Sequence, residues 1–550
     1  MAKAKRGFTF DYINVRKPNY SKFNLSHDHL CAMGSGYLVP LWWTNMVPGD
    51  VFKCNLSGFV RLLALSSPML QREDIKIRAF KVPWRILADR KDLDKAFAGD
   101  QHGNHIDFPF IEWNINDLNV GSLADYLQLP LPYKYDSSTG SWVKLNSGEI
   151  GEGVQLSTNI FPLLAYHRIY HDHFRNEETE NQWLDVFEQH YSTIDGINSQ
   201  NTLHDLDTDA PTHLLGALHK VGWERDYFTS ALASSQRGSE INIPLIGTAP
   251  VKVGDLRSSD PSMELTYEQE PTPRISAHHG SGEFMPLELS VDGSAFTGIG
   301  AIALRMLMNL QAFMERNNIS GYRMIGNILA HFGVRSSNQL HDEAEYLGGI
   351  ASPITISAVT QTSATENNGT PQGTQVGQGI ASFHDHLFTT RAEEPCVLMV
   401  VGYITGKSSY SQGLARKWSQ RSYLDLYWPE FQTVGEQEIL CQELFYDYRI
   451  PTSSSYYRND KTWAYQSRYS EYKYEPDSIA GDFRTSLSYW HQSRLFTSLP
   501  SFNDSFIKSN LSDRVFAIDT DTFPRPYLCE FYFDVQAVRP MDKYAISKLW

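Results

Sequence analysis

Alternating apolar and polar positions predict β-strands along much of this chain. The strand candidates are residues 51–65, 74–82, 396–404, 514–518 and 528–535. In the second of these stretches, Ile75, Ile77 and Ala79 share one face and polar side chains occupy the other. The last stretch alternates more cleanly with the same period of two. Residues 396–404 are apolar at almost every position, which indicates a central strand buried on both faces.

Helical periodicity is found in fewer places. The helix candidates are residues 162–174, 298–316 and 322–332, each with an apolar stripe. Ser320 is a candidate N-cap for the third helix, and Gly333 is a candidate stop. Residues 247–293 are rich in Gly, Pro, Ser and charge, which is typical of loops. A minority of helices in a strand-rich chain predicts a mainly β fold, a barrel or sandwich with long loop insertions and a few helices.

Composition and charge narrow the class of protein. Aromatic side chains make up 13% of the 550 residues, which suits an assembling subunit with large interfaces and equally suits an aromatic core. The formal net charge of -15 argues against a dedicated duplex-DNA binder, which is usually basic.

The first 22 residues depart from this acidic balance. Six basic side chains stand there against one acidic side chain, so residues 1–22 form a basic N-terminal arm. Such an arm on an acidic body often touches nucleic acid, and a solvated, frayed terminus is the alternative. The candidate DNA-binding residues of the arm are Lys3, Lys5, Arg6, Arg16 and Lys17.

The cysteines and the apolar runs indicate the compartment in which the protein folds. The five cysteines are scattered and form no CxxC pair, so neither a disulfide framework nor a zinc site is expected. We expect reduced thiols in a protein that folds in a cytosolic compartment. The apolar runs are short or interrupted by charge, and they predict neither a membrane span nor an export signal.

Three His-Asp-His triplets, centred on Asp28, Asp172 and Asp385, are the candidates for metal binding. On a strand, such a triplet projects both imidazoles to one face, where they could hold a metal ion. None comes with a closing ligand at motif spacing, so we favour a structural role and expect neither a metal nor a cofactor. A calcium site built from scattered carboxylates remains an alternative, because such a site leaves no compact motif in the sequence. The sequence has no nucleophile-elbow, dinucleotide-binding or kinase motif, and we assign no catalytic residues.

Twelve short strings carry more information by their order than any one of them does alone. They include Gly36-Tyr37-Leu38-Val39-Pro40, Val47-Pro48-Gly49-Asp50, Asp226-Tyr227-Phe228-Thr229, Glu345-Tyr346-Leu347-Gly348-Gly349, Tyr427-Trp428-Pro429 and Arg468-Tyr469-Ser470-Glu471-Tyr472. Together they resemble the major capsid protein of the Microviridae, specifically its gokushovirus branch. The resemblance covers both ends and most of the middle of the chain. It weakens in residues 136–153, 181–222 and 254–295.

The resemblance implies a fold and a function. The implied fold is an eight-stranded antiparallel jelly roll. The implied function is a structural protein, not an enzyme, that self-assembles into a small icosahedral shell around the circular single-stranded DNA of a bacteriophage. Implied partners are copies of the chain, viral DNA, other virion and scaffolding proteins and a host cell surface receptor. The implied location is the virion, after assembly in the bacterial host cytoplasm.

One other class of protein fits the composition. A β-rich carbohydrate-binding protein or a glycoside hydrolase would also be rich in aromatic and acidic side chains. The hydrolase would need two carboxylates facing each other across a cleft.

Two segments of the implied single capsid domain, residues 23–550, are candidate contact sites. Residues 254–295 take the place of an insertion that protrudes at the three-fold axes of gokushoviruses, and a merely long loop is the alternative. Its candidate host-contact residues are Met263, Tyr267, His278, His279 and Phe284. Residues 395–424 contain no acid, and they suit either DNA or an intersubunit contact. The candidate residues there are Arg416, Lys417, Trp418 and Arg421.

Overall fold

The computed structural model divides the chain into two compact units. One unit consists of Met1–Ser235 and Ser320–Trp550, and the other of Gln236–Ile319. The expected protrusion, residues 254–295, falls inside the second unit. The structure describes residues 18–88, 90–98, 102, 108, 110–113, 118–145, 149, 156–180, 216–238, 251–253, 264–268, 274–278, 284–285, 289–291, 301–321, 323–362, 372–449, 459–511, 513–517 and 524–544.

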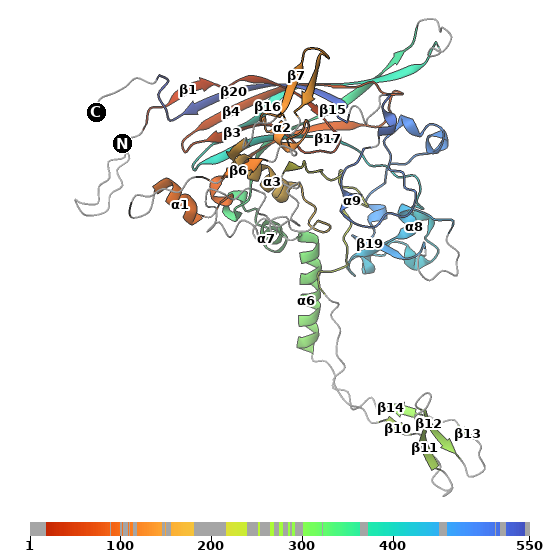
Figure 1. Cartoon of the computed structure of the whole chain (residues 1–550). Coiled ribbons are helices and arrows are strands. Elements are labelled where there is room, and N and C mark those ends of the chain that lie inside the picture. The colour runs from red at the N-terminus through yellow and green to blue at the C-terminus, as the bar shows by residue number, and fades with distance from the viewer. Residues whose placement is uncertain are drawn as a thin grey trace. The chain divides into compact units, whose positions relative to one another are not determined.

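A curled antiparallel sheet forms the centre of the first unit (Figure 1). Its strands are β1 (Ser21–Asn24), β2 (His27–Met33), β3 (Val39–Met46), β4 (Val51–Leu62), β5 (Glu73–Pro83), β15 (Glu345–Thr360), β16 (Gln375–Arg391), β17 (Cys396–Gly406) and β20 (Tyr527–Arg539). Both β1 and β2 pair with β20 in one continuous register, interrupted only at Leu25 and Ser26. They are therefore two parts of the same edge strand. The sheet has eight positions, in the order β1/β2, β20, β4, β16, β15, β5, β17 and β3.

The pairing of these strands is that of a jelly roll. Along the chain, the first strand pairs with the last, the second with the seventh, the third with the sixth and the fourth with the fifth. These pairs are β1/β2 with β20, β3 with β17, β4 with β16 and β5 with β15. The chain is one long antiparallel hairpin that wraps around itself, as two Greek keys require. The predicted mainly β, eight-stranded jelly roll is confirmed.

The inner face of the sheet encloses the main core. Along β20, alternate residues from Tyr527 to Ala537 are buried, while Leu528, Glu530 and Tyr532 point to solvent. Successive side chains of a strand point to opposite faces, so one face of β20 is core and the other is surface. This confirms the alternation predicted for residues 528–535.

Strand β17 is buried on both faces, as its sequence predicts. Leu398 and Val400 belong to the main core, whereas Val397 and Met399 belong to a second core on the outside of the sheet. Helices α2 (Leu123–Tyr126) and α3 (Phe161–His173) supply much of that second core. In Figure 1, α3 lies against the part of the sheet that holds β17. A helix that is buried almost all round belongs in such an interior position.

Short elements fill the long connections of the first unit. They are β6 (Phe110–Trp113), β7 (Tyr133–Asp136), β8 (Ser141–Lys144), β9 (Leu156–Asn159), β18 (Gln437–Leu440), β19 (Thr462–Gln466), α1 (Arg90–Ala98), α7 (Met324–Phe332), α8 (Cys441–Leu444) and α9 (Asp504–Ile507). The 3₁₀ turns are η1 (Trp84–Ile86), η5 (Asn338–His341), η6 (Arg416–Trp418), η7 (Tyr423–Asp425), η8 (Pro429–Phe431), η9 (Ser470–Tyr472), η10 (Gly481–Arg484), η11 (Ser488–Trp490) and η12 (Asp513–Val515).

Two details of the sequence-based expectations are wrong, and one is confirmed. The strand expected at residues 514–518 does not form in its described part, residues 514–517, where η12 ends at Val515 and Phe516 makes an isolated β-bridge with Leu65. Ser320 does not cap α7, whose N-cap is Arg323. Gly333 does end α7, in the left-handed conformation that favours glycine.

The second unit contains a helix and small sheets. Its described residues include the helix α6 (Ala301–Ser320) and the strands β10 (Val251–Val253), β11 (Glu264–Glu268), β12 (Arg274–His278), β13 (Phe284–Met285) and β14 (Leu289–Val291). Strand β10 pairs with β14, and β12 pairs with both β11 and β13. The expectation that residues 247–293 are loop is therefore wrong for these strands. Glu268 of β11 and Arg274 of β12 pair on either side of a Pro-containing sequence that alone would indicate a loop. Among the described helices of the chain, none is both long and apolar enough to cross a bilayer.

Candidate assembly and DNA-binding surfaces

The His-Asp-His triplet on β2 faces the sheet interior with its imidazoles. The ring of His27 stacks on Phe533, with centroids 5.2 Å apart, and its Nδ1 lies 2.9 Å from the carbonyl of Leu25. This histidine is thus a packing residue at the edge of the main core.

The other two triplets also bond to protein groups. On α3, Asp172 accepts hydrogen bonds of 2.8 Å from Arg168 and from the backbone of Ala344, just before β15. On β16, His384 lies 2.6 Å from the hydroxyl of Ser57, and His386 lies 3.0 Å from the amide oxygen of Asn55. Within the described part of the chain, no three His, Cys, Asp or Glu side chains gather as metal ligands would. The triplets join neighbouring strands and helices.

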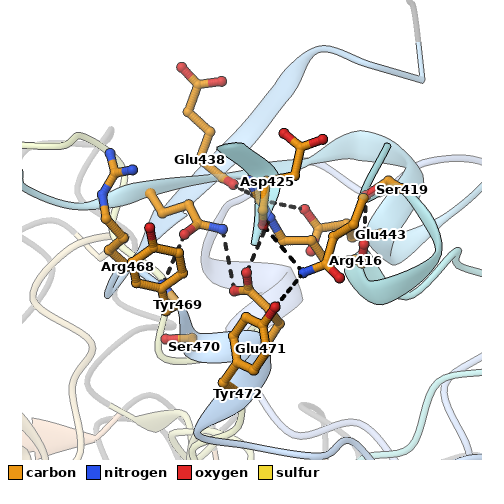
Figure 2. Close-up of polar contacts among 12 residues, drawn as sticks. Arg416, Ser419, Asp425, Glu438, Glu443, Arg468, Tyr469, Ser470, Glu471 and Tyr472 are labelled. Atoms are coloured by element: carbon orange, nitrogen blue, oxygen red, sulfur yellow. Dashed lines mark hydrogen bonds and ion pairs between the residues drawn. The ribbon is translucent and has the colours of Figure 1, made fainter. Parts of the chain in front are cut away.

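Arg416 lies at the centre of a cluster of charged groups in the loops around β18 and β19 (Figure 2). Its Nη1 donates to Glu443 at 3.0 Å and also to the backbone carbonyl of Glu438, and its Nε lies 3.8 Å from Glu471. Glu443 is almost completely buried, and it accepts further hydrogen bonds from the hydroxyl of Tyr227 and from the backbone of Leu440. Arg416 therefore holds η6 against α8 and η9.

Burial and the neighbouring charges have opposite effects on the pKa of Glu443. Burial raises the pKa of this carboxyl, and the hydrogen bonds together with the charge of Arg416 oppose that rise. A buried carboxylate needs such partners, because removing them leaves an uncompensated charge. The cluster is thus an internal clamp between three loop segments.

The four candidate residues of this region fall into two groups. Arg416 is committed to the clamp, and Lys417 pairs with Glu475 at 2.6 Å on the surface. Trp418 is 73% exposed and Arg421 is also exposed, so these two side chains are accessible to a partner. The positive charge seen in the sequence is largely matched by acids that come from distant positions in the chain.

Exposed aromatic side chains gather in the segments η6 to η9, and only Trp418 among them is a candidate from the sequence. We call this group the aromatic surface, and its residues are Trp418, Tyr423, Tyr427, Trp428, Phe431 and Tyr472. The indole of Trp428 donates to the carbonyl of Tyr423, and the rings of Tyr427 and Tyr472 lie edge to face. Each of these side chains is at least 41% exposed. The signal available in the sequence was a run of aromatics without strand or helix periodicity.

A second exposed apolar surface lies on α6. The predicted apolar stripe of this helix includes Ile302, which is 83% exposed, Met306, which is 72% exposed, and Phe313, which is 50% exposed. Side chains at this spacing share one face of the helix. Contiguous exposed apolar side chains of this kind mark interaction sites on a subunit.

The remaining candidates are only partly within the described residues. The DNA-binding candidates Lys3, Lys5, Arg6, Arg16 and Lys17 lie outside them, as do Met263 and His279 of the host-contact segment. The backbones of the other three host-contact candidates are placed. Tyr267 lies in β11, and His278 of β12 is the register partner of Phe284 of β13.

Comparison with known proteins identifies the family of the chain. The model of the family described as capsid protein (F protein) matches residues 13–549. This chain belongs to that capsid protein family. It is 26% identical to the capsid protein VP1 of Chlamydia phage 1, and 27% identical to the capsid protein VP1 of Bdellovibrio phage phiMH2K. Each alignment covers 96% of this chain and 95% of the relative.

The family membership confirms the resemblance to Microviridae capsid proteins. The capsid protein of Spiroplasma virus 4, 24% identical over 96% of this chain, is a further relative of the same kind. The chain is therefore a structural capsid subunit of a virion and not an enzyme, which removes the glycoside hydrolase alternative. A capsid subunit functions by burying surface against other subunits, so the exposed apolar side chains of this capsid protein are candidates for such contacts.

Proposed function

We propose that copies of this capsid protein close into a small icosahedral shell around circular single-stranded DNA, in the cytoplasm of a bacterial host. The exposed aromatic surface carries the assembly part of this proposal, because Trp418 and Tyr423 are 73% and 69% exposed on the single subunit. Large aromatic side chains dominate the energetics of subunit interfaces. The five free cysteines support folding in a reducing compartment.

Within this proposal, Trp418 and Arg421 contact a neighbouring subunit in preference to DNA. Lys417 is paired with an acid and Arg416 is part of the clamp, so the local field is not strongly positive. Exposed aromatic side chains also occur in η7 and η8, which follow Trp418 in the chain, and such side chains are enriched in protein interfaces.

Substitution separates the two roles of this surface. Trp418→Ala and Arg421→Ala should lower the yield of shells and leave the unfolding midpoint of the free subunit unchanged. If both variants form normal shells that hold less DNA, the surface is a DNA contact instead. Lys417→Ala is the matched control, because its exposed ion pair contributes little.

The basic arm is the proposed DNA contact. Lys3, Lys5, Arg6, Arg16 and Lys17 would face the shell interior and neutralise phosphates without reading sequence. Support comes from the concentration of positive charge in residues 1–22 of an otherwise acidic chain. Changing all five to Glu should lower the DNA content per particle, measured by absorbance ratio and nuclease protection, more than it lowers shell yield. Unchanged DNA content in assembled particles would rule out this role for the arm.

Residues 254–295 are the proposed host-contact protrusion, through Met263, Tyr267, His278, His279 and Phe284. The segment belongs to a compact unit of its own, which supports a separate role for it. Strand β10 ends at Val253 opposite Leu289 of β14, so residues 254–288 can be replaced by a short Gly/Ser turn that keeps this pair. We expect shells that form normally and adsorb poorly to host cells.

Two other outcomes of that deletion would contradict the host-contact role. Normal adsorption would remove the receptor role, and failure to assemble would make the segment a structural clasp. Full-length Tyr267→Ala serves as a milder variant that leaves the β11 and β12 backbone pairing available.

A further inference from the structure

Two cysteines lie directly opposite each other at the edge of the jelly roll. Cys31 of β2 and Cys529 of β20 are register partners, and both side chains contact the main core. The thiol of Cys529 donates to the backbone carbonyl of Tyr527 on its own strand, at 3.9 Å. Opposed residues of an antiparallel pair have Cα atoms about 4.5–5.5 Å apart, a separation that a disulfide can span. Both residues are free thiols here.

The surroundings give the two sulfurs different reactivity. Interaction with the Cys529 thiol, helped by the neighbouring His29, lowers the pKa of Cys31 although burial opposes the change. The same interaction and burial raise the pKa of Cys529. Cys31 is half-buried, whereas Cys529 is only 4% exposed. A more accessible thiolate next to a protected thiol is the arrangement of an attacking and a resolving cysteine.

The other cysteines do not share these properties. Burial raises the pKa of Cys54 and of Cys396 to about 12, and it also raises the pKa of Cys441. These three thiols therefore form the reactive thiolate less readily than Cys31, and they serve as internal controls.

We propose that Cys31 and Cys529 are an oxidation site that closes into a disulfide when the capsid protein meets a peroxide. The Cys31 thiolate attacks one oxygen of hydrogen peroxide, which breaks the O–O bond and gives a sulfenic acid and hydroxide. Cys529 loses its proton to that hydroxide, and its sulfur attacks the sulfur of Cys31. The S–O bond breaks and hydroxide leaves, which takes up the proton that Cys31 released on ionisation. The two sulfurs lose two electrons, and peroxide is reduced to two waters.

The disulfide would fasten one edge of the sheet. Strand β2 lies at the edge of the main sheet, where it pairs with β20. Its pairing with β20 is interrupted between β1 and β2. A bond between residues 31 and 529 closes a loop of nearly the whole chain, and cross-links of long loops restrict the unfolded state most. Thiols stay reduced in a cytosolic compartment and meet oxidants outside it. The site is therefore suited to strengthening particles after they leave the host.

Thiol counting on assembled particles tests the proposal. Purified wild-type particles are treated with a small excess of hydrogen peroxide, denatured and alkylated. We expect five labelled cysteines before treatment and three after it, with a cross-linked peptide that contains Cys31 and Cys529. Dithiothreitol should restore five. Cys54→Ser particles should likewise lose two labels, and Cys31→Ser particles should lose none.

A thermal measurement accompanies the count. Oxidation should raise the unfolding midpoint of wild-type particles and leave that of Cys31→Ser particles unchanged. Five labelled cysteines in treated wild-type particles would overturn the proposal, as would sulfinic acid at Cys31 with a free Cys529. The peptide analysis of wild-type particles decides the matter even where Cys31→Ser fails to assemble.

Discussion

The hydroxyl of Tyr527 donates a hydrogen bond of 2.9 Å to the carboxyl of Glu73 inside the jelly roll, where both side chains are completely inaccessible to solvent. The two residues are 454 positions apart in the chain. Burial raises the pKa of Glu73 to about 7, and the hydrogen bond from Tyr527 only partly opposes that rise. The carboxyl is therefore a pH-sensitive group in the core.

Replacing Glu73 with Gln should stabilise the subunit above pH 7. A carboxyl whose pKa is higher in the folded than in the unfolded chain favours folding while it is protonated. That contribution is complete below pH 4.5, the ordinary value, and is lost as the pH rises to about 7. We expect a gain of up to roughly 3 kcal/mol at pH 8 and almost none at pH 4, measured by urea unfolding of the free subunit. Glu475→Gln, on the surface, should show no such pH dependence, and equal effects at both pH values would contradict the prediction.

Removing the charge of Arg539 should strongly destabilise the subunit. Arg539 at the end of β20 lies 2.9 Å from Asp50, which is completely buried. Arg539→Met leaves that carboxylate without its ion partner, at a cost of about 3–5 kcal/mol. Adding Asp50→Asn should recover part of the loss. Arg449→Met breaks an exposed pair with Asp447 and should cost less than about 0.5 kcal/mol; similar losses in both variants would refute the argument.

Adding a methyl group at position 58 should strain the sheet. Gly58 of β4 is the register partner of Phe383, and a Cβ there would lie 2.2 Å from the ring of Phe383. We expect Gly58→Ala to cost about 1–3 kcal/mol of unfolding free energy, and Phe383→Leu to relieve most of it in the double variant. Gly222→Ala is the matched control, because its new methyl group would make only ordinary contacts. A double variant no more stable than Gly58→Ala would show that the ring is not the obstacle.

Charge on one face of α6 should impair assembly without unfolding the subunit. Met306 and Met308 are 72% and 65% exposed, and they point to opposite sides of the helix. Met306→Glu interrupts the stripe that includes Ile302 and Phe313, whereas Met308→Glu does not. We expect a loss of shell yield in electron micrographs for Met306→Glu alone, with unchanged circular dichroism for both. Normal shells from Met306→Glu would show that the stripe is not an intersubunit contact.

Periodic patterns let the sequence determine the faces of several strands by itself. The alternation of residues 528–535 fixed which side of β20 is core, because successive side chains of a strand must point to opposite faces. The unbroken apolar run of residues 396–404 likewise required cover on both faces of β17, and two separate cores provide it. These properties depend on neighbours in the chain, so they can be read locally.

The identity of pairing partners was decided only by the tertiary structure. Cys31 meets Cys529, and Arg416 meets Glu443 and Glu471, through contacts that no local pattern encodes. The acid-free stretch of residues 395–424 indicated a positive surface, yet folding brings acids from elsewhere in the chain to Arg416 and Lys417. Register, strand order and charge pairing in a jelly roll join residues hundreds of positions apart. Side-chain periodicity predicts which face of each strand is buried. The pairing of strands in the folded sheet determines which residues pack against that face.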